Sequence, residues 1–372
     1  MNEEMVDLIA AEDESYSNDD LFNITSWGAD PSIRELVQAY EENDMIKPEL
    51  QRNYVWEEKE ASRFVESILL GLPVPSIFLA NRPNGKRLIV DGFQRIMTVC
   101  YFMRNTWAGT DKEFRLYNSE LINERWRGKT YAELSEDDKR RFKTYTIHAI
   151  IFEQKQPKND SALFQVFERI NTSGKALNAQ EIRNCVYQGN CNSLLIELNE
   201  NPNWRYYVGK AIDKRMLDTE LILRFFALRN LNIADFNDGV ITLKKLLNDY
   251  MSERKVMDEN EIQRMRNDFT KCILFIHQTL GEEAFYNYQA DLKTLRRKLY
   301  PTIFDSIMIA TSIALSRGYQ YKESLMERRE RLLRDEEYRN NITQGTMRKI
   351  AIRTRVALAL KYLYDMTLKE NA

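Results

Sequence analysis

The stretch at residues 87–103, RLIVDGFQRIMTVCYFM, decides the fold of the first half of the chain. It opens with a short, partly β-branched apolar run of strand length, Leu88-Ile89-Val90. The dipeptide Asp91-Gly92 interrupts this run. Apolar residues then recur at helical spacing, at Phe93, Ile96, Cys100 and Met103. The pattern predicts a strand, a tight turn and a helix in direct succession.

The first turn of that helix combines an anion-binding backbone with polar side chains. Its unpaired N–H groups and the positive end of the helix dipole favour a bound anion. Asp91 can hold a metal ion or a water, and Arg95 can clamp a phosphate; Gln94 and Thr98 lie beside them in the sequence. A structural interpretation stays open, because Asp91-x-x-Gln94 is also a capping-box pattern with Asp91 as the N-cap.

Composition narrows the classes of protein. The chain has 372 residues, 43% of them hydrophobic, which is enough for two domains or one large domain with a sizeable core. A net charge of −2 gives no general support for nucleic-acid binding, so any such binding needs a local patch. Two histidines argue against a zinc site and against an HNH-type nuclease.

The four cysteines form no C-x-x-C pair, and we expect reduced structural thiols. The sequence shows no signal-peptide pattern and no long apolar segment. We therefore expect a cytoplasmic protein that makes no membrane contact.

The pattern along the chain predicts an α+β fold in three parts. Residues 1–20 hold eight acidic residues and no basic ones, which is typical of a solvated tail. Residues 21–200 mix strand and helix patterns around a small sheet, and residues 201–372 read as an all-α domain. Near the start of the mixed part, Asp30-Pro31 predicts a helix with Asp30 as its cap.

Four other polar stretches allow both a structural and a functional interpretation. Gln51 and Arg52 precede an aromatic run and could face a ligand, and the loop at 169–178 is rich in donors. Glu153-Gln154-Lys155 matches the E-x-K of a common nuclease core with Asp137 or Asp138 upstream, although a polar turn explains it better. Residues 322–355 hold ten Lys/Arg and six Asp/Glu, which suits a solvated helix face or a DNA-binding face.

Three stretches taken together resemble a known family. They are QRNYVW at 51–56 leading into SILLGLPVPSIFL at 67–79, VDGFQRIMTV at 90–99, and FERINTSGKALNAQEIRN at 167–184. In this order and spacing they are similar to the N-terminal domain of GmrSD-type modification-dependent restriction endonucleases. The resemblance covers roughly residues 22 to 230 and implies a ParB/sulfiredoxin-like fold.

The signature of that family is an Asp-Gly-Gln-Gln-Arg turn associated with nucleoside triphosphate binding and hydrolysis. Asp91, Gly92, Gln94 and Arg95 match it, whereas Phe93 stands where the first glutamine usually is. If that glutamine orients a water or a phosphate, the chain would bind nucleotide and turn it over slowly. If position 93 faces the core, Phe93 is harmless.

The resemblance implies roles for particular residues. Asp91, Gln94 and Arg95 would be catalytic, with Asp91 positioning Mg²⁺ or the attacking water and Arg95 neutralising developing charge. The nucleotide-binding residues would be Gln51, Arg52, Gly92, Thr98, Arg169, Asn171, Thr172, Lys175 and Asn178.

The implied function is a nucleotide-binding, NTP-hydrolysing component of a bacterial restriction or anti-phage defence system. It would use Mg²⁺ and an NTP such as GTP, ATP or CTP, and it would act on or respond to DNA such as modified phage DNA. Lacking an HNH domain, it would work with a separate nuclease subunit and could form a homo-oligomer. Two alternatives stay open: a DNA-binding module without turnover, and a metal-dependent DNA nuclease using Asp91 with Glu153 or Glu181.

Overall fold

The computed structural model describes residues 24–46, 54–108, 110–155, 160–170, 177–213, 215–288, 294–321 and 324–368. The chain divides into two compact units. Of the described residues, those from 24 to 177 and Asn184–Val186 form the sheet unit, and Asn178–Arg183 and those from 187 onward form the helical unit. The fold is α+β, as expected. The predicted tail at 1–20 lies outside the described residues, and the domain limits 21–200 and 201–372 stay predictions.

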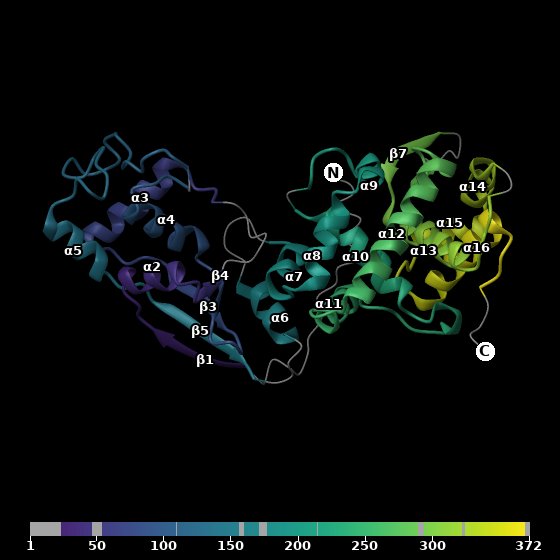
Figure 1. Ribbon diagram of the computed structural model, residues 1–372, viewed down its shortest axis with the longest axis horizontal. Helices are drawn as coiled ribbons and strands as arrows, with labels where there is room; N and C mark the ends of the chain where they lie inside the picture. Colours follow the sequence, from purple (N-terminus) through teal and green to yellow (C-terminus); the bar gives the residue numbers. More distant parts are fainter. Residues whose placement is uncertain are drawn as a thin grey trace. The chain divides into compact units, whose positions relative to one another are not determined.

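A five-stranded mixed sheet organises the sheet unit (Figure 1). Its strand order is β1-β5-β3-β4-β2. The outer pair β1 and β5 and the inner pair β3 and β4 are antiparallel, whereas β3 with β5 and β2 with β4 are parallel. The strand bounds are β1 Ile24–Ala29, β2 Met45–Ile46, β3 Ile77–Asn81, β4 Arg87–Asp91 and β5 Ala149–Gln154.

One face of this sheet, here called the helix-covered face, carries the main core. Strand residues such as Leu79, Ile89 and Ile151 lie opposite one another across β3, β4 and β5 and are buried with apolar residues of four helices. Those helices are α2 Ile33–Glu41, α3 Glu58–Leu70, α4 Phe93–Met103 and α5 Glu136–Thr144. Helices α2, α3 and α4 each contribute an apolar stripe to this core, as amphipathic helices do, whereas α5 contributes Phe142.

The opposite face, here called the second face, is covered at one end. Ala80, Leu88 and Phe152 alternate with the core residues and are also buried. Helix α6, Ser161–Ile170, packs against β5, and the Gln154 side chain accepts a hydrogen bond from the Leu163 N–H of that helix. We infer that α6 covers the end of the second face where β5 finishes.

The strand, turn and helix at 87–103 form as the sequence predicts. Gly92 takes the left-handed conformation with φ 98° and is the N-cap of α4. A Cβ atom at this position would lie 2.4 Å from Cγ2 of Ile77 in the neighbouring strand. Glycine is therefore required both for the backbone conformation and for the close approach of β3.

The predicted start of the first helix is wrong. Helix α2 begins at Ile33, and Ser32 forms the capping box with Glu35. The Asp30 carboxylate instead bonds to the His148 ring at 2.8 Å. The carbonyl of Pro31 accepts a hydrogen bond from the Ile147 N–H, so this proline holds the strand connection and does not open the helix.

The helical unit contains a small sheet in addition to its helices. Strands β6 Tyr286–Tyr288 and β7 Leu295–Leu299 pair antiparallel, which the expectation of an all-α part did not include. Its core holds charged side chains, and Arg224 and Arg355 both contact the buried Asp305 carboxylate. The helices are α7 Ala179–Val186, which continues into the sheet unit, α8 Asn190–Asn199, α9 Pro202–Val208, α10 Leu217–Arg229, η2 Ile233–Asp235, α11 Leu243–Glu253, α12 Glu259–Leu280, α13 Pro301–Ser316, α14 Leu325–Arg334, α15 Glu336–Thr343 and α16 Lys349–Tyr364.

The four cysteines are all buried and free. Burial raises the pKa of the Cys100 thiol to about 12, which leaves it protonated and unreactive. Among the described residues, no helix is long and apolar enough to cross a membrane.

We predict that Gly92→Ala destabilises the sheet unit more than Gly85→Ala. Both glycines have positive φ, but only Gly92 has a neighbour within 4 Å of the added Cβ. The extra loss in the free energy of unfolding should be about 1–3 kcal/mol, the usual effect of overpacking. Tryptophan fluorescence during denaturation can measure it, because Trp27, Trp56, Trp107 and Trp126, four of the five tryptophans, lie in this unit. Equal losses in the two variants would contradict the close approach.

Candidate functional site

The turn between β4 and α4 is held by an ion pair. The Arg95 guanidinium donates through Nη2 to Asp91 Oδ2 at 2.5 Å, across an i, i+4 spacing. Its Nη1 donates to the carbonyls of Pro75 and Ser76 at 2.8 and 2.9 Å. The Asp91 side chain is 34% exposed and that of Arg95 only 12%. Asp91 is thus the accessible member of the pair, and Arg95 joins the helix to the segment that leads into β3.

The capping-box interpretation of Asp91 and Gln94 is wrong. Gly92 is the N-cap, and no side chain caps α4. Gln94 reaches away from the helix end, and its Oε1 accepts from the N–H groups of Val55 and Trp56 at 3.0 and 3.3 Å. The N-cap residue therefore offers no side chain to the first turn of α4, and the positive end of the helix dipole lies next to Asp91.

Thr98 lies inside the unit, where it binds Tyr54. Its Oγ1 donates to the carbonyl of Gln94 at 2.7 Å and shares a hydrogen bond of 2.8 Å with the Tyr54 hydroxyl. Burial raises the pKa of Tyr54 to about 12, although the bond to Thr98 lowers it in part. Tyr54 therefore stays neutral at physiological pH. Thr98 is fully buried, and its hydroxyl holds the side chain of Tyr54 in place in this structure.

Position 93 faces the core. The Phe93 side chain is 5% exposed and belongs to the apolar cluster under the sheet. The place where the family usually has its first glutamine therefore points away from the open end of α4. This arrangement favours the interpretation in which Phe93 does no harm.

Two of the other predicted nucleotide-binding residues lie in the described part of the chain. Arg169 is exposed in the last turn of α6. Asn178 forms the predicted capping box with Glu181 at the start of α7, and its amide donates to the Arg215 carbonyl at 2.7 Å. The roles of these two residues stay predictions. The remaining ones, Gln51, Arg52, Asn171, Thr172 and Lys175, lie outside the described residues.

The acidic residues of the nuclease alternative have structural partners. The Glu153 carboxylate accepts from the Asn81 amide at 3.4 Å, and Glu181 contacts Arg215 at 3.4 Å. Burial by itself would raise the pKa of Asp138, but hydrogen bonds from Ser135 and Trp126 and the charge of Arg125 leave it lowered. Within the described ranges, no group of three or more His, Cys, Asp or Glu residues could hold a metal ion.

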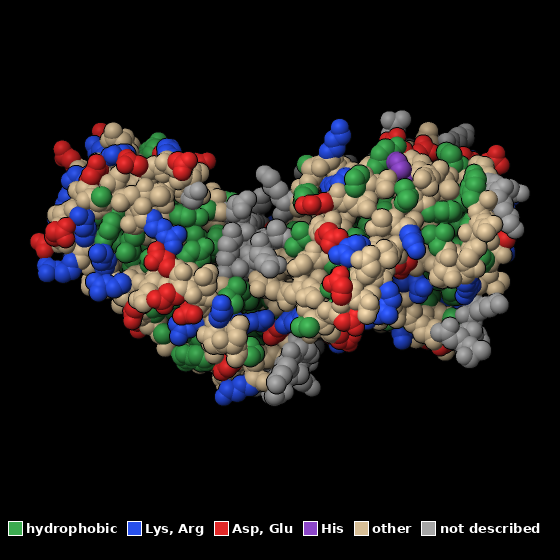
Figure 2. All heavy atoms as spheres, viewed as in Figure 1, with side chains coloured by type: hydrophobic (Ala, Val, Ile, Leu, Met, Phe, Trp, Pro, Cys, Tyr) green, Lys and Arg blue, Asp and Glu red, His purple; other side chains and the backbone are tan. Residues whose placement is uncertain are grey.

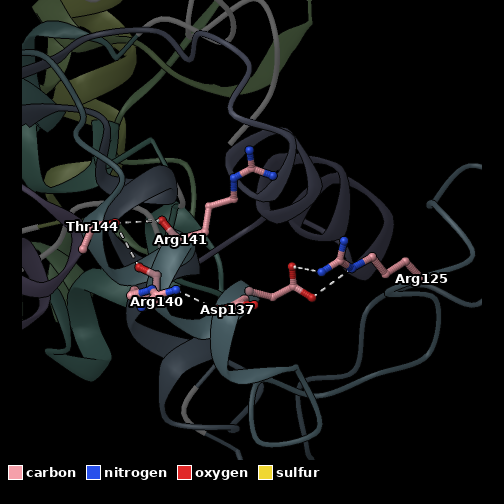
Figure 3. A pocket seen from close by; sticks show the side chains of 6 residues that line it. Arg125, Asp137, Arg140, Arg141 and Thr144 are labelled. Atoms are coloured by element: carbon pink, nitrogen blue, oxygen red, sulfur yellow. Dashed lines mark hydrogen bonds and ion pairs between the residues drawn. The ribbon is translucent and has the colours of Figure 1, made fainter.

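A separate pocket of about 370 Å³ lies beside α5 (Figure 3). Arg125 binds the Asp138 carboxylate with two hydrogen-bonded nitrogens, and Arg140 pairs with Asp137. Arg141 donates to the Leu69 carbonyl. Because its arginines are committed to carboxylates or to a carbonyl, this pocket is a weak anion site.

The basic residues at 322–355 do not form one exposed face. Arg329 is buried and donates to the carbonyls of Ala284 and Tyr286, and Arg355 is buried against Asp305. Arg328 pairs with Asp365. On the face shown in Figure 2, acidic and basic side chains are interspersed over the helical unit. The solvated-helix interpretation of this stretch therefore gains support.

Sequence reasoning missed the residues that hold the turn in place. Tyr54, the backbone of Val55 and Trp56, and the carbonyls of Pro75 and Ser76 all contact side chains of α4. These contacts join parts of the chain 19 to 44 residues apart. Only the i, i+4 spacing of Asp91 and Arg95 was a signal present in the sequence.

Comparison with known proteins finds one family whose N-terminal domain is similar to the part of the chain that contains this site. Residues 33–188 match the family described as GmrSD restriction endonuclease, N-terminal domain. The match confirms the resemblance over most of the sheet unit, including the turn at 91–95. Neither a curated protein nor a solved structure gives a significant match to the chain.

We predict that Gln94→Ala loosens the segment at 54–57 while Gln94→Glu does not. Alanine removes the oxygen that accepts from the Val55 and Trp56 N–H groups, whereas glutamate keeps one. A lost hydrogen bond is worth about 0.5–1.5 kcal/mol, so these two amides should exchange with solvent roughly twofold to tenfold faster. Hydrogen exchange of the full chain can measure this. Unchanged protection in the alanine variant would show that Gln94 does not hold this segment.

Proposed function

We propose that this chain is a nucleotide-dependent component of a restriction-type defence system, and that its sheet unit binds a nucleoside triphosphate at the N-terminus of α4. The family match at residues 33–188 supports the first part, because the matched family is the N-terminal domain of a restriction endonuclease. One observation carries the second part: α4 starts at a left-handed glycine with no side-chain cap, directly beside the accessible Asp91 carboxylate.

An uncapped helix end suits the phosphates. Its first N–H groups and its dipole attract anions. Glycine at the N-cap supplies the left-handed backbone from which α4 starts, so these N–H groups follow directly after Asp91. The pair of Asp91 and Arg95 keeps the net side-chain charge of the turn near zero, so the helix end supplies the attraction.

The residues fit Mg²⁺ only if waters and the nucleotide phosphates supply most of its ligands. Asp91 is the accessible carboxylate of the turn, and the described residues offer no cage of three acidic groups. Mg²⁺ commonly uses one or two carboxylates together with waters and substrate phosphates. When bound with the nucleotide it would neutralise phosphate charge and orient the attacking water. Asp91 would hold the Mg²⁺. The proposal also includes a ParB/sulfiredoxin-like fold for the sheet unit.

Arg95 acts mainly by positioning in this proposal. Its guanidinium holds Asp91 on one side and the carbonyls of Pro75 and Ser76 on the other. It therefore fixes the carboxylate relative to the helix end, which matters because misplacement by about 1 Å can reduce a rate about a hundredfold.

The proposal also includes a cytoplasmic location, DNA as the effector and a separate nuclease subunit.

The main alternative is a DNA-binding module without turnover. It would use the same helix end for a backbone phosphate, and its binding would weaken steeply with salt. The nuclease alternative has less support, because the described acidic residues do not gather into a metal site.

The test is phosphate release from ATP, GTP, CTP and UTP with Mg²⁺, with and without DNA. We predict that Asp91→Asn, which keeps the shape of the side chain, lowers the rate about 10²–10³-fold. Glu153→Gln is the matched control, because Glu153 is a partly exposed carboxylate near the end of β5, which β3 separates from β4. This variant should keep the wild-type rate.

Other outcomes separate the alternatives. Absence of both release and nucleotide binding in the wild type would overturn the proposal. Salt-sensitive DNA binding that survives Asp91→Asn, without turnover, would favour the binding module. Mg²⁺-dependent DNA cutting that Glu153→Gln abolishes would favour the nuclease.

A further inference from the structure

The second face of the sheet is less covered at the end nearest the turn, although Val90 of β4 is buried there. Rows of residues run across it from β4 to β1. In one row Leu88, Ala80 and Phe152 are buried. In the row closer to α4, Phe78 and Ile150 are only partly buried, and Gly28 is exposed. The covered part of this face thus ends between the two rows.

A β-bulge directs Asp91 towards this open row. The register between β3 and β4 shifts between Phe78 and Leu79, so that Phe78 pairs with Asp91 whereas Leu79 pairs with Ile89. Leu79 and Ile89 belong to the core of the helix-covered face, so Phe78 points to the second face. Residues paired across antiparallel strands share a face, and a bulge commonly redirects a side chain near a functional site. Asp91 therefore adjoins Phe78.

The row continues onto the outer strands. Phe78 pairs with Ile150 in β5, and Ile150 pairs with Gly28 in β1. The His148 ring lies directly over Gly28, because a Cβ there would be 3.0 Å from its Cε1 atom. That ring is half-exposed and bonds to Asp30. With strands about 4.8 Å apart, the row is roughly 14 Å long, with a carboxylate at one end and an imidazole at the other.

We propose that Phe78, Ile150 and His148 form the surface that binds the base of the nucleotide. This inference rests on the proposed nucleotide site and extends it to the part of the ligand that carries its identity. The helix end binds phosphate and does not distinguish one base from another. A flat, partly apolar surface with a phenyl ring, directly beside Asp91, suits a planar heterocycle. The His148 ring, fixed by Asp30, adds a polar edge to which a base can hydrogen-bond.

Continuity with the phosphate site selects this occupant over others. Phe78 is two residues from Ser76, whose carbonyl binds Arg95, and it pairs with Asp91 itself. A ligand with phosphates at the start of α4 therefore has the partly exposed Phe78 beside it along the sheet. Stacking of a base on an aromatic side chain contributes about 1–3 kcal/mol.

The test compares nucleotides with inorganic tripolyphosphate, which has the phosphates without the base. Binding of both to the full chain is measured by titration calorimetry with Mg²⁺. We predict that Phe78→Ala weakens nucleotide binding about tenfold and leaves tripolyphosphate binding within twofold. Phe78→Leu, which keeps the apolar bulk and is less disruptive to folding, should give an intermediate loss. Trp27→Ala is the matched control: Trp27 is an exposed aromatic residue that pairs with Ile151 on the helix-covered face, so its loss should change neither affinity.

The outcomes separate this inference from the function on which it rests. If neither nucleotide nor tripolyphosphate binds the wild type, the proposed function fails and the base surface with it. If both bind and Phe78→Ala and Phe78→Leu change neither affinity, or weaken both ligands equally, the phosphate site stands and the base surface is overturned. A Trp27→Ala loss equal to that of Phe78→Ala would overturn it as well.

Discussion

The ion pair between Asp91 and Arg95 is the constraint on which the sheet unit's site depends. It links the last residue of β4 to the first turn of α4, and the same guanidinium links both to the start of β3. An exposed ion pair is usually worth less than about 1 kcal/mol, but Arg95 is nearly buried and makes three hydrogen bonds. Losing Asp91 would leave a mostly buried guanidinium with two of its three hydrogen bonds and no opposite charge, which is more harmful than losing both partners.

This constraint decides how a mutation in the turn must be interpreted. Removing the Asp91 side chain changes the chemistry of the turn and also the position of Arg95. An asparagine keeps an oxygen for Arg95 to bind while it removes the negative charge, so it separates charge from geometry. The same reasoning applies to Gln94, because its oxygen positions the segment that contains Tyr54.

The local elements of the fold could be predicted from the sequence, since they depend on neighbouring residues. The strand at 87–91, its glycine break and α4 follow from periodicity and from the need for a left-handed residue at Gly92. The capping box of Asn178 and Glu181 was also visible. At the two wrong caps a nearby competitor decided the outcome: Ser32 displaced Asp30, and Gly92 displaced Asp91. The two displaced carboxylates bond instead to Arg95 and His148. The i, i+4 spacing indicated Arg95 as the partner of Asp91, whereas no local spacing indicated His148, which is 118 residues from Asp30.

The arrangement of the site required the three-dimensional register. No periodicity in the sequence pairs Phe78 with Asp91, because the bulge that does so is a property of two strands together. The hydroxyl of Tyr54 meets Thr98 across 44 residues of chain, and the strands β6 and β7 form in a part with a mainly helical pattern. Contacts of this kind depend on packing between distant segments, which sequence propensity does not encode.

The groups that remain accessible determine what chemistry the turn can perform. Of the three side chains that match the family signature, Gln94 and Arg95 are committed to the backbone of neighbouring segments, and Asp91 alone is substantially exposed. Phe93 lies in the core, so its difference from glutamine removes nothing from the open face. Fast phosphoryl transfer generally needs an arginine that is free to meet the charge of the transition state, and its absence commonly lowers the rate 10³–10⁵-fold. Because Arg95 is already paired with Asp91, the proposed nucleotide site would hydrolyse its ligand slowly if it relied on this turn alone. Such a site would act as a timer that holds the chain in a nucleotide-bound state, and a faster rate would require a cation supplied by another part of the chain or by a partner.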